Sequence, residues 1–189
     1  MYKFVLASKS PRRKELLTNI GMTFEVKESD FDETTVSKDL APDLYVQELA
    51  MFKAMSLIKQ VEKDTLVIGA DTVVVLDGKI LGKPCGRHDA MSMLADLSGR
   101  VHSVYTGICV ARSNDAKTVA TCVKTDVYFK KLSVDEIEYY VDKFQPFDKA
   151  GSYGIQEYAG VFVERIDGDY FNIVGLPVCK LNQIINDEF

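Results

Sequence analysis

The chain lacks the residue patterns by which several common classes of enzyme are recognised. It has only two histidines, and no CxxC pair occurs among its four cysteines, Cys85, Cys109, Cys122 and Cys179. Zinc sites and disulfide frameworks show other spacings, so we expect reduced, mostly structural thiols. A Walker A motif, a GxGxxG turn, a nucleophile elbow and an HExxH pair are also missing. Kinase, dehydrogenase and esterase functions therefore have little support.

Long apolar runs and surplus basic charge are missing as well. No segment approaches the roughly 20 apolar residues that a membrane helix needs. Residues 1–9 hold too short an apolar run for a signal peptide. The formal net charge is -5, whereas a nonspecific nucleic-acid binder relies on excess lysine and arginine. We expect a soluble cytoplasmic protein without nucleic-acid or membrane partners.

The composition is that of an ordinary globular protein, with 47% hydrophobic and 27% charged residues among 189. This length suits one domain, or two lobes that share a cleft. Hairpins alternate with helices, which indicates an α/β or α+β fold with a mixed sheet. The patterns predict strands at residues 2–6, 24–26, 65–68, 73–76, 79–81, 101–111, 119–129 and 161–165, and helices at 11–20, 42–58, 88–97, 134–141 and 176–185. Residues 148–156 have loop character.

Residues 6–13 read as the end of a strand that turns directly into a helix. Ser10 is a good N-cap, and Pro11 suits the first helical position. The free backbone N–H groups and the positive end of the helix dipole then lie beside Arg12 and Arg13. Such a place binds phosphates. The alternative is that both arginines are solvated charges on an ordinary capped helix.

Carboxylates stand at two unusual places. Asp71 interrupts a strand that otherwise reads as buried, and an unpaired buried charge is costly, so we expect it to face a cleft, a lysine or a metal. A structural pair or turn cap is the alternative. Glu33 follows Asp30 and Asp32 on a connecting segment, where the carboxylates either bind a hard cation such as magnesium or form a solvated charge run.

Three lysines accompany these acids. Lys53 lies on the second predicted helix, Lys83 in a Gly-Lys-Pro loop, and Lys149 in the loop at 148–156. Each residue taken alone fits an exposed surface lysine. Together they would supply the cationic clamp that a reacting polyphosphate requires.

Six segments in order, at residues 8–13, 69–74, 82–84, 98–102, 148–156 and 175–177, resemble the Maf family of nucleoside triphosphate pyrophosphatases. The resemblance covers essentially the whole chain. It implies one domain over residues 1–189, with two lobes around a deep cleft and a long mixed β-sheet with flanking helices. The implied fold is similar to that of the inosine triphosphate pyrophosphatases, and family members are often homodimers.

The resemblance also implies an activity. The family cleaves nucleoside triphosphates between the α- and β-phosphates with a divalent cation, Mg²⁺ or Mn²⁺. Asp71 falls on the family's proposed proton acceptor. Three positions linked to substrate choice, occupied here by Arg12, Thr72 and Gln156, resemble the branch that acts on dTTP and UTP, with CTP and modified pyrimidine nucleotides as further substrates. The implied role is sanitation of the nucleotide pool, with a link to cell division arrest.

Two alternatives remain: the family branch that acts on 7-methyl-GTP, and a nucleotide-binding division regulator without turnover. Every proposed acid and lysine is present, which favours catalysis.

The residues and the resemblance together predict a mechanism. Ser8, Arg12 and Arg13, with Lys149, hold the triphosphate at the helix start. Lys53 and Lys83 neutralise charge on the attacked phosphorus and on the leaving pyrophosphate. Asp71 and Glu33 bind the metal or activate the water, in an order that the sequence leaves open. Gln156 and Thr72 read the pyrimidine or tune access to the pocket.

Overall fold

A seven-stranded mixed sheet forms the centre of the molecule in the computed structural model, which describes residues 2–37 and 39–189. The strand order is β2-β1-β3-β5-β6-β7, and β4 pairs with β3. The first strand is parallel to both of its neighbours, whereas the remaining pairs are antiparallel. The strands are β1 (Lys3–Ala7), β2 (Glu25–Lys27), β3 (Thr65–Leu76), β4 (Lys79–Leu81), β5 (Val101–Arg112), β6 (Thr118–Phe129) and β7 (Val163–Asp167).

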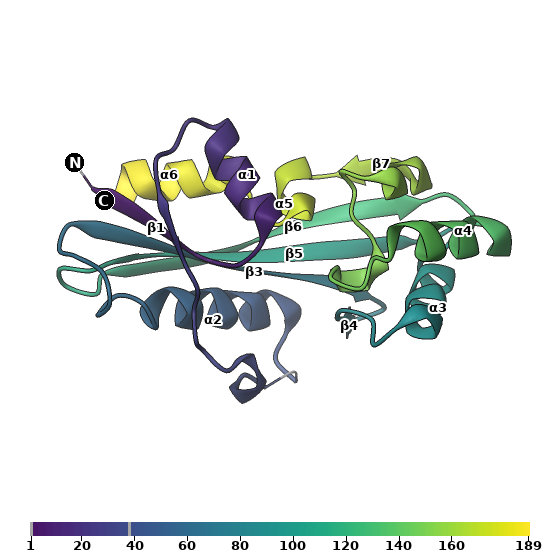
Figure 1. Cartoon of the computed structure of the whole chain (residues 1–189), viewed down its shortest axis with the longest axis horizontal. Coiled ribbons are helices and arrows are strands. Elements are labelled where there is room, and N and C mark those ends of the chain that lie inside the picture. Colours follow the sequence, from purple (N-terminus) through teal and green to yellow (C-terminus); the bar gives the residue numbers. More distant parts are fainter. Residues whose placement is uncertain (1, 38) are drawn as a thin grey trace.

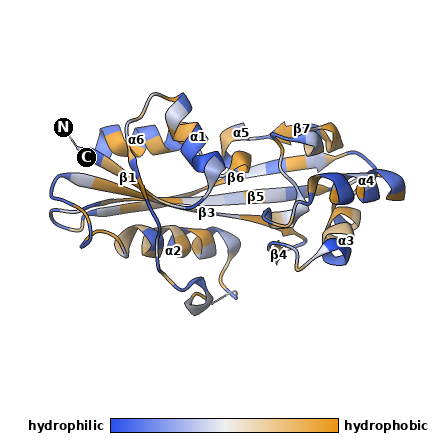
Figure 2. Cartoon of the chain, in the orientation of Figure 1, coloured by the Kyte–Doolittle hydropathy of each residue, from blue (hydrophilic) through white to orange (hydrophobic). Residues whose placement is uncertain are grey.

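Helices flank both faces of this sheet, as predicted. In Figure 1, α1 and α6 lie on one face and α2 on the other, while α3 and α4 gather at the end of the sheet opposite the termini. Figure 2 shows hydrophilic and hydrophobic colours side by side on α4 and α6, as helices with one buried face require. The helices are α1 (Pro11–Asn19), α2 (Pro42–Met55), α3 (Arg87–Leu97), α4 (Val134–Phe144), α5 (Tyr170–Val174) and α6 (Val178–Glu188), with 3₁₀ turns η1 (Glu33–Thr35), η2 (Ala150–Ser152) and η3 (Tyr158–Phe162).

Within the described residues, no helix is long and apolar enough to cross a membrane. All four cysteines are free thiols, of which Cys109 is buried, Cys122 is half-buried, and Cys85 and Cys179 are exposed, so only part of the set is structural. The single domain over residues 1–189 stays a prediction, and residues 1 and 38 lie outside the described part of the chain.

Local sequence signals fix several boundaries. The Ser10 hydroxyl accepts a hydrogen bond from the Arg13 backbone N–H at 3.5 Å and caps α1. At the start of α4, Ser133 and Glu136 form the reciprocal capping box. The hairpin between β3 and β4 turns at residues 77–78, both with positive φ, 50° and 77°, as a type I′ turn requires.

Three elements differ from their predicted forms. The two short strands predicted at 65–68 and 73–76 are one strand, β3, because residues 69–72 also pair with β5. The strand predicted at 161–165 begins at Val163, since the preceding segment winds into η3 and buries Phe162. The sequence analysis missed α5, a single short helix capped by Asp169.

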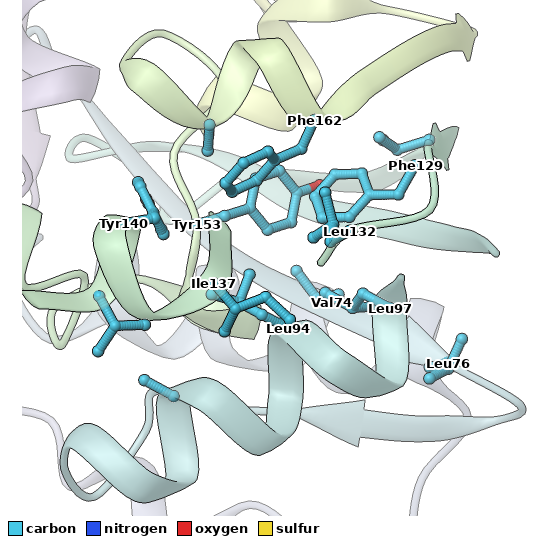
Figure 3. Packing of buried hydrophobic residues seen from close by; sticks show 14 of the residues in the cluster. Val74, Leu76, Leu94, Leu97, Phe129, Leu132, Ile137, Tyr140, Tyr153 and Phe162 are labelled. Carbon is cyan, nitrogen blue, oxygen red and sulfur yellow. The ribbon is translucent and has the colours of Figure 1, made fainter. Parts of the chain in front are cut away.

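An aromatic core fills the end of the sheet near α3 and α4. The ring centroid of Phe129 lies 4.9 Å from that of Tyr153 and 6.0 Å from that of Phe162. Figure 3 shows these three rings with Leu132 beside them. His102 is only 2% exposed within this cluster. Its Nε2 lies 2.7 Å from the Tyr153 hydroxyl, so the histidine is a core residue.

Burial lowers the pKa of His102 to about 4 from 6.5, with a smaller opposing effect of Asp126. The folded protein therefore keeps His102 neutral, while the unfolded chain takes up a proton below pH 6.5. We expect the free energy of unfolding to fall between pH 6.5 and 4 by about 3 kcal/mol from this residue alone. His102→Phe should show a shallower fall in urea unfolding, and the exposed His88→Gln should follow the wild type. Equal slopes in all three proteins would contradict this assignment.

Candidate active site

One cavity of about 890 Å³ brings together every site residue predicted from the sequence. Its walls come from the β1–α1 junction, η1, α2, the middle of β3, the loop after β4 and residues 148–157. Its volume matches that of small-molecule sites. The predicted residues that line it are Ser8, Arg12, Arg13, Glu33, Lys53, Asp71, Thr72, Lys83, Lys149 and Gln156.

Asp71 and Lys53 form an ion pair in the wall of the cavity. The Lys53 Nζ lies 2.6 Å from Asp71 Oδ1, and the side chains of Lys53 and Asp71 are only 12% and 13% exposed. The same Nζ lies 2.7 Å from Oε1 of Glu33, whose side chain is 56% exposed. The lysine thus joins the two carboxylates that the sequence analysis selected.

Two glycines explain how α2 approaches the sheet closely enough for this pair. Gly69 precedes Asp71 on the same face of β3, and Gly107 pairs with Asp71 across the sheet. A Cβ at Gly69 would lie 2.1 Å from the backbone oxygen of Ala50, and one at Gly107 would lie 2.1 Å from that of Val46. Only glycine, which has no side chain, fits at these two positions beneath α2. The close approach of the helix brings Lys53 within contact of Asp71.

Arg13 is held by three neutral acceptors, one nearby in the sequence and two from distant parts of the chain. Its Nε donates to the Gly175 backbone oxygen at 2.8 Å, Nη1 to Ser8 Oγ at 3.1 Å and Nη2 to Thr72 Oγ1 at 3.1 Å. Of the five N–H groups of a guanidinium, three are used and two remain. No carboxylate in the described chain lies within ion-pair distance of it. Burial lowers the pKa of Arg13, yet arginine stays charged at neutral pH.

The Ser8 hydroxyl has one group left for a ligand. Its oxygen accepts from Arg13 Nη1 and, at 3.2 Å, from the Ser10 backbone N–H. Both lone pairs are therefore occupied, and the hydroxyl proton remains. An anion would bind here, because the charged Arg13 guanidinium, the free hydroxyl proton of Ser8 and the N-terminus of α1 lie together.

A second charged network connects Arg12 to residues 148–157. Arg12 Nη1 lies 3.1 Å from Asp148, and the buried Lys149 Nζ lies 2.8 Å from Asp148 and 3.4 Å from Glu157. Burial opposes ionisation of Asp148, but hydrogen bonds from Lys149 and Arg12 outweigh it and hold its pKa below the usual value. The charge of Lys149 is thus already balanced.

Lys83 and Gln156 are exposed at the cavity, and neither side chain has a hydrogen-bond or ion-pair partner in the described residues. The loop that carries Lys83 is tied to the opposite wall, because the Gly151 N–H donates to the Gly82 oxygen at 3.0 Å. Both side chains are therefore free to contact a ligand.

The sequence analysis missed three residues of the cavity wall. Asp148 and Glu157 hold Lys149, and only the adjacency of Asp148 to that lysine was a signal in the sequence. Tyr45 of α2 lines the cavity, and burial raises its pKa, with added contributions from the charges of Asp71 and Glu33. Tyr45 was not selected because it lies on the apolar side of the predicted helix, where a tyrosine is expected to be part of the core.

The carboxylates suit a hard cation that takes few protein ligands. In the described part of the chain, no group of three or more His, Cys, Asp or Glu residues is arranged to hold a metal. Asp71 and Glu33 offer oxygen ligands on either side of Lys53. Magnesium commonly binds one or two carboxylates and completes its shell with water and phosphate oxygens. The two carboxylates suit such an ion only when the Lys53 ammonium, which contacts both of them, has moved away.

Comparison with known proteins gives a consistent result. Residues 3–188 match the family model described as Maf-like protein. A protein of Thermoanaerobacter pseudethanolicus named dTTP/UTP pyrophosphatase is 51% identical over 187 residues, which cover 99% of this chain and 97% of the relative. A protein of Alkaliphilus metalliredigens with the same name is 48% identical over 189 residues, which cover 100% of this chain and 97% of that relative.

Solved structures share the fold at much lower identity. The Staphylococcus aureus Ham1 protein has a TM-score of 0.55 and 18% identity, with 99% of this chain and 100% of that chain covered. A HAM1 protein from Coxiella burnetii has a TM-score of 0.53 and 16% identity at the same coverage. The mixed α/β architecture is therefore a shared one, as predicted.

Proposed function

This chain belongs to the Maf-like protein family, and from that membership we propose that it is a nucleoside triphosphate pyrophosphatase acting on dTTP and UTP. The products are the nucleoside monophosphate and pyrophosphate. One observation in the structure carries the proposal: the Asp71–Lys53 ion pair lines the same cavity as Arg13, a cation with only neutral partners among the described residues. A reacting carboxylate and a polyanion site thus share one cavity.

The triphosphate binds at the start of α1. Arg13 offers its two remaining N–H groups, and Ser8 offers its hydroxyl proton. Lys83, exposed and unpaired within the described chain, reaches the same anion as a mobile positive charge. These donors stabilise charge on the leaving pyrophosphate, which is the main task in phosphoryl transfer.

Asp71 activates the water. As the water oxygen bonds to the attacked phosphorus, one of its protons passes to the Asp71 carboxylate and the bond to the α–β bridging oxygen breaks. The phosphate oxygens compete with Asp71 for Lys53, whose Nζ already contacts two carboxylates. Transfer of the lysine toward the phosphate frees the Asp71 carboxylate to accept the proton of the water.

We propose Mg²⁺ or Mn²⁺ as the divalent cation, with Asp71 and Glu33 as the residues that would hold it. When bound, such an ion neutralises phosphate charge and makes a nearby water more acidic. The support is the pair of carboxylates on either side of one ammonium group. A cytoplasmic homodimer that clears noncanonical nucleotides is the setting that we propose from the family resemblance.

Gln156 is the proposed reader of the base, since its free amide can both donate to and accept from a pyrimidine amide edge. We expect Gln156→Ala to lower the ratio of pyrimidine to purine turnover by a larger factor than it lowers the rate of catalysis on dTTP. Steady-state rates with dTTP, UTP, dGTP and ATP measure this. An unchanged order of substrates would remove Gln156 from recognition.

Incubation of the protein with Mg²⁺ or Mn²⁺ and a panel of nucleotides, followed by a pyrophosphate assay, tests the function. We expect pyrophosphate from dTTP and UTP at higher rates than from purine triphosphates or 7-methyl-GTP. Preference for 7-methyl-GTP would assign the chain to the other family branch. Nucleotide binding without release of pyrophosphate would identify a binding protein.

A further inference from the structure

A buried hydroxyl behind the cavity sets the direction of a hydrogen bond inside it. Thr106 on β5 is 0% exposed, and its Oγ1 donates to the Asn172 backbone oxygen at 2.8 Å. The Thr72 Oγ1 lies 2.9 Å from the Thr106 Oγ1. A hydroxyl has one proton, and Thr106 has given its own to Asn172. Thr72 is therefore the donor to Thr106.

The direction of this bond decides whether the Thr72 hydroxyl can accept a hydrogen bond from Arg13. With its proton directed at Thr106, Thr72 presents a lone pair to Arg13 Nη2, which donates to it at 3.1 Å. Three hydrogen bonds thus run in one sense, from Arg13 to Thr72, from Thr72 to Thr106 and from Thr106 to the Asn172 carbonyl. Bonds aligned in this way polarise and strengthen one another.

The last acceptor in this series of hydrogen bonds, Asn172, is held in place by further hydrogen bonds. Asn172 is fully buried on α5, and its Nδ2 donates to the Val104 backbone oxygen and to Thr125 Oγ1, both at 3.0 Å. The same helix is followed by its C-cap residue, Gly175, whose backbone oxygen accepts a hydrogen bond from Arg13 Nε at 2.8 Å. The short helix α5 therefore fixes Arg13 directly through Gly175 and indirectly through Thr106.

We propose that Thr106 is a positioning residue for triphosphate binding, acting through Thr72 on the Arg13 guanidinium. Thr106 is buried and is not part of the cavity wall, so it does not touch the substrate. Its hydroxyl holds Thr72 as an acceptor and keeps the two unused N–H groups of Arg13 available for the anion. The proposal rests on the proposed function, in which Arg13 binds the triphosphate.

Two matched pairs of proteins isolate the hydroxyl. Wild type and Thr106→Val differ in one hydroxyl replaced by a methyl group. Thr106→Ser and Thr106→Ala both lose the methyl group and differ in the hydroxyl alone, so they provide the comparison if the valine variant fails to fold. Thr65→Val is the control, since Thr65 is also a buried threonine of the sheet but its hydroxyl has no hydrogen bond to Thr72 or Arg13.

The measurements are kcat and KM for dTTP and, by calorimetry, the Kd for inorganic tripolyphosphate, which has no base. Without the Thr106 hydroxyl, Thr72 is no longer held with a lone pair toward Arg13. We therefore expect KM and the tripolyphosphate Kd to rise about tenfold in Thr106→Val relative to the wild type, and in Thr106→Ala relative to Thr106→Ser. The change in kcat should be smaller. Thr65→Val and Thr106→Ser should stay near the wild type.

Equal tripolyphosphate affinity in the serine and alanine variants would overturn the proposal. That holds whether both variants keep the wild-type affinity or both lose affinity to the same extent, the second being the result expected of a merely structural residue. The calorimetric test separates this proposal from the proposed function. If no nucleotide is hydrolysed, the function fails, while the tripolyphosphate affinities still decide whether Thr106 positions Arg13.

Discussion

Asp71→Asn should lower the turnover of dTTP and UTP at least ~100-fold while the protein stays folded, which is the lower end for loss of a general base. The amide keeps the size of the carboxylate but neither accepts a proton from water at neutral pH nor carries its charge. Lys53 retains its contact with Glu33 at 2.7 Å, so the variant does not leave the ammonium without a partner. Single-turnover release of pyrophosphate and a thermal melt provide the two readings.

Asp126→Asn is the matched control for this experiment. Asp126 is also an aspartate on a strand of the sheet, and it also contacts a lysine, Lys124, at 3.1 Å. It lies outside the cavity that holds Asp71, so its variant should keep wild-type turnover. Near-native turnover in Asp71→Asn would remove Asp71 as the proton acceptor, and an equal loss in both variants would indicate a general effect on the fold.

Gly107→Ala should have the largest effect on stability. The new Cβ would lie 2.1 Å from the oxygen and 2.3 Å from the carbonyl carbon of Val46, and both are backbone atoms of α2 that no rotamer change can move. The helix must shift, at a cost of about 3 kcal/mol for overpacking. In a chain of this size we expect the Tm to fall by about 5–10 °C. Turnover should fall too, because α2 carries Lys53.

Gly86→Ala is the control, since a Cβ at Gly86 meets nothing within 4 Å. A thermal melt of both variants, followed by a dTTP assay below the lower Tm, separates stability from activity. An unchanged melting temperature in Gly107→Ala would show that α2 does not depend on the glycine for its distance from the sheet.

Much of the fold was predictable because its boundaries are set by local chemistry. The caps at Ser10 and Ser133 and the Asp-Gly hairpin act within a few residues, and each lies where the sequence indicated. The continuous strand β3 was not predictable, because pairing with β5 rather than local propensity carries the strand through Gly69 and Asp71. The helix α5 is too short to show a periodic pattern.

The candidate site divides in the same way. Residue types and the family resemblance selected the acids and cations that line the cavity, but the sequence does not say which of them are paired. The contact of Lys53 with both Asp71 and Glu33 depends on how closely α2 approaches the sheet. Thr106 gave no signal, because a buried threonine in a strand looks like any other β-branched residue until its partners are known.

The acceptors of Arg13 also determine when the site is completed during synthesis. The arginine leaves the ribosome well before Gly175, which follows 162 positions later. Contacts so far apart in sequence form only after the intervening chain has closed into a loop. A nascent chain that ends before Gly175 has a cationic helix start without its full set of acceptors. Competence to hold phosphate therefore arrives only after Gly175 has been synthesised and has folded back to Arg13.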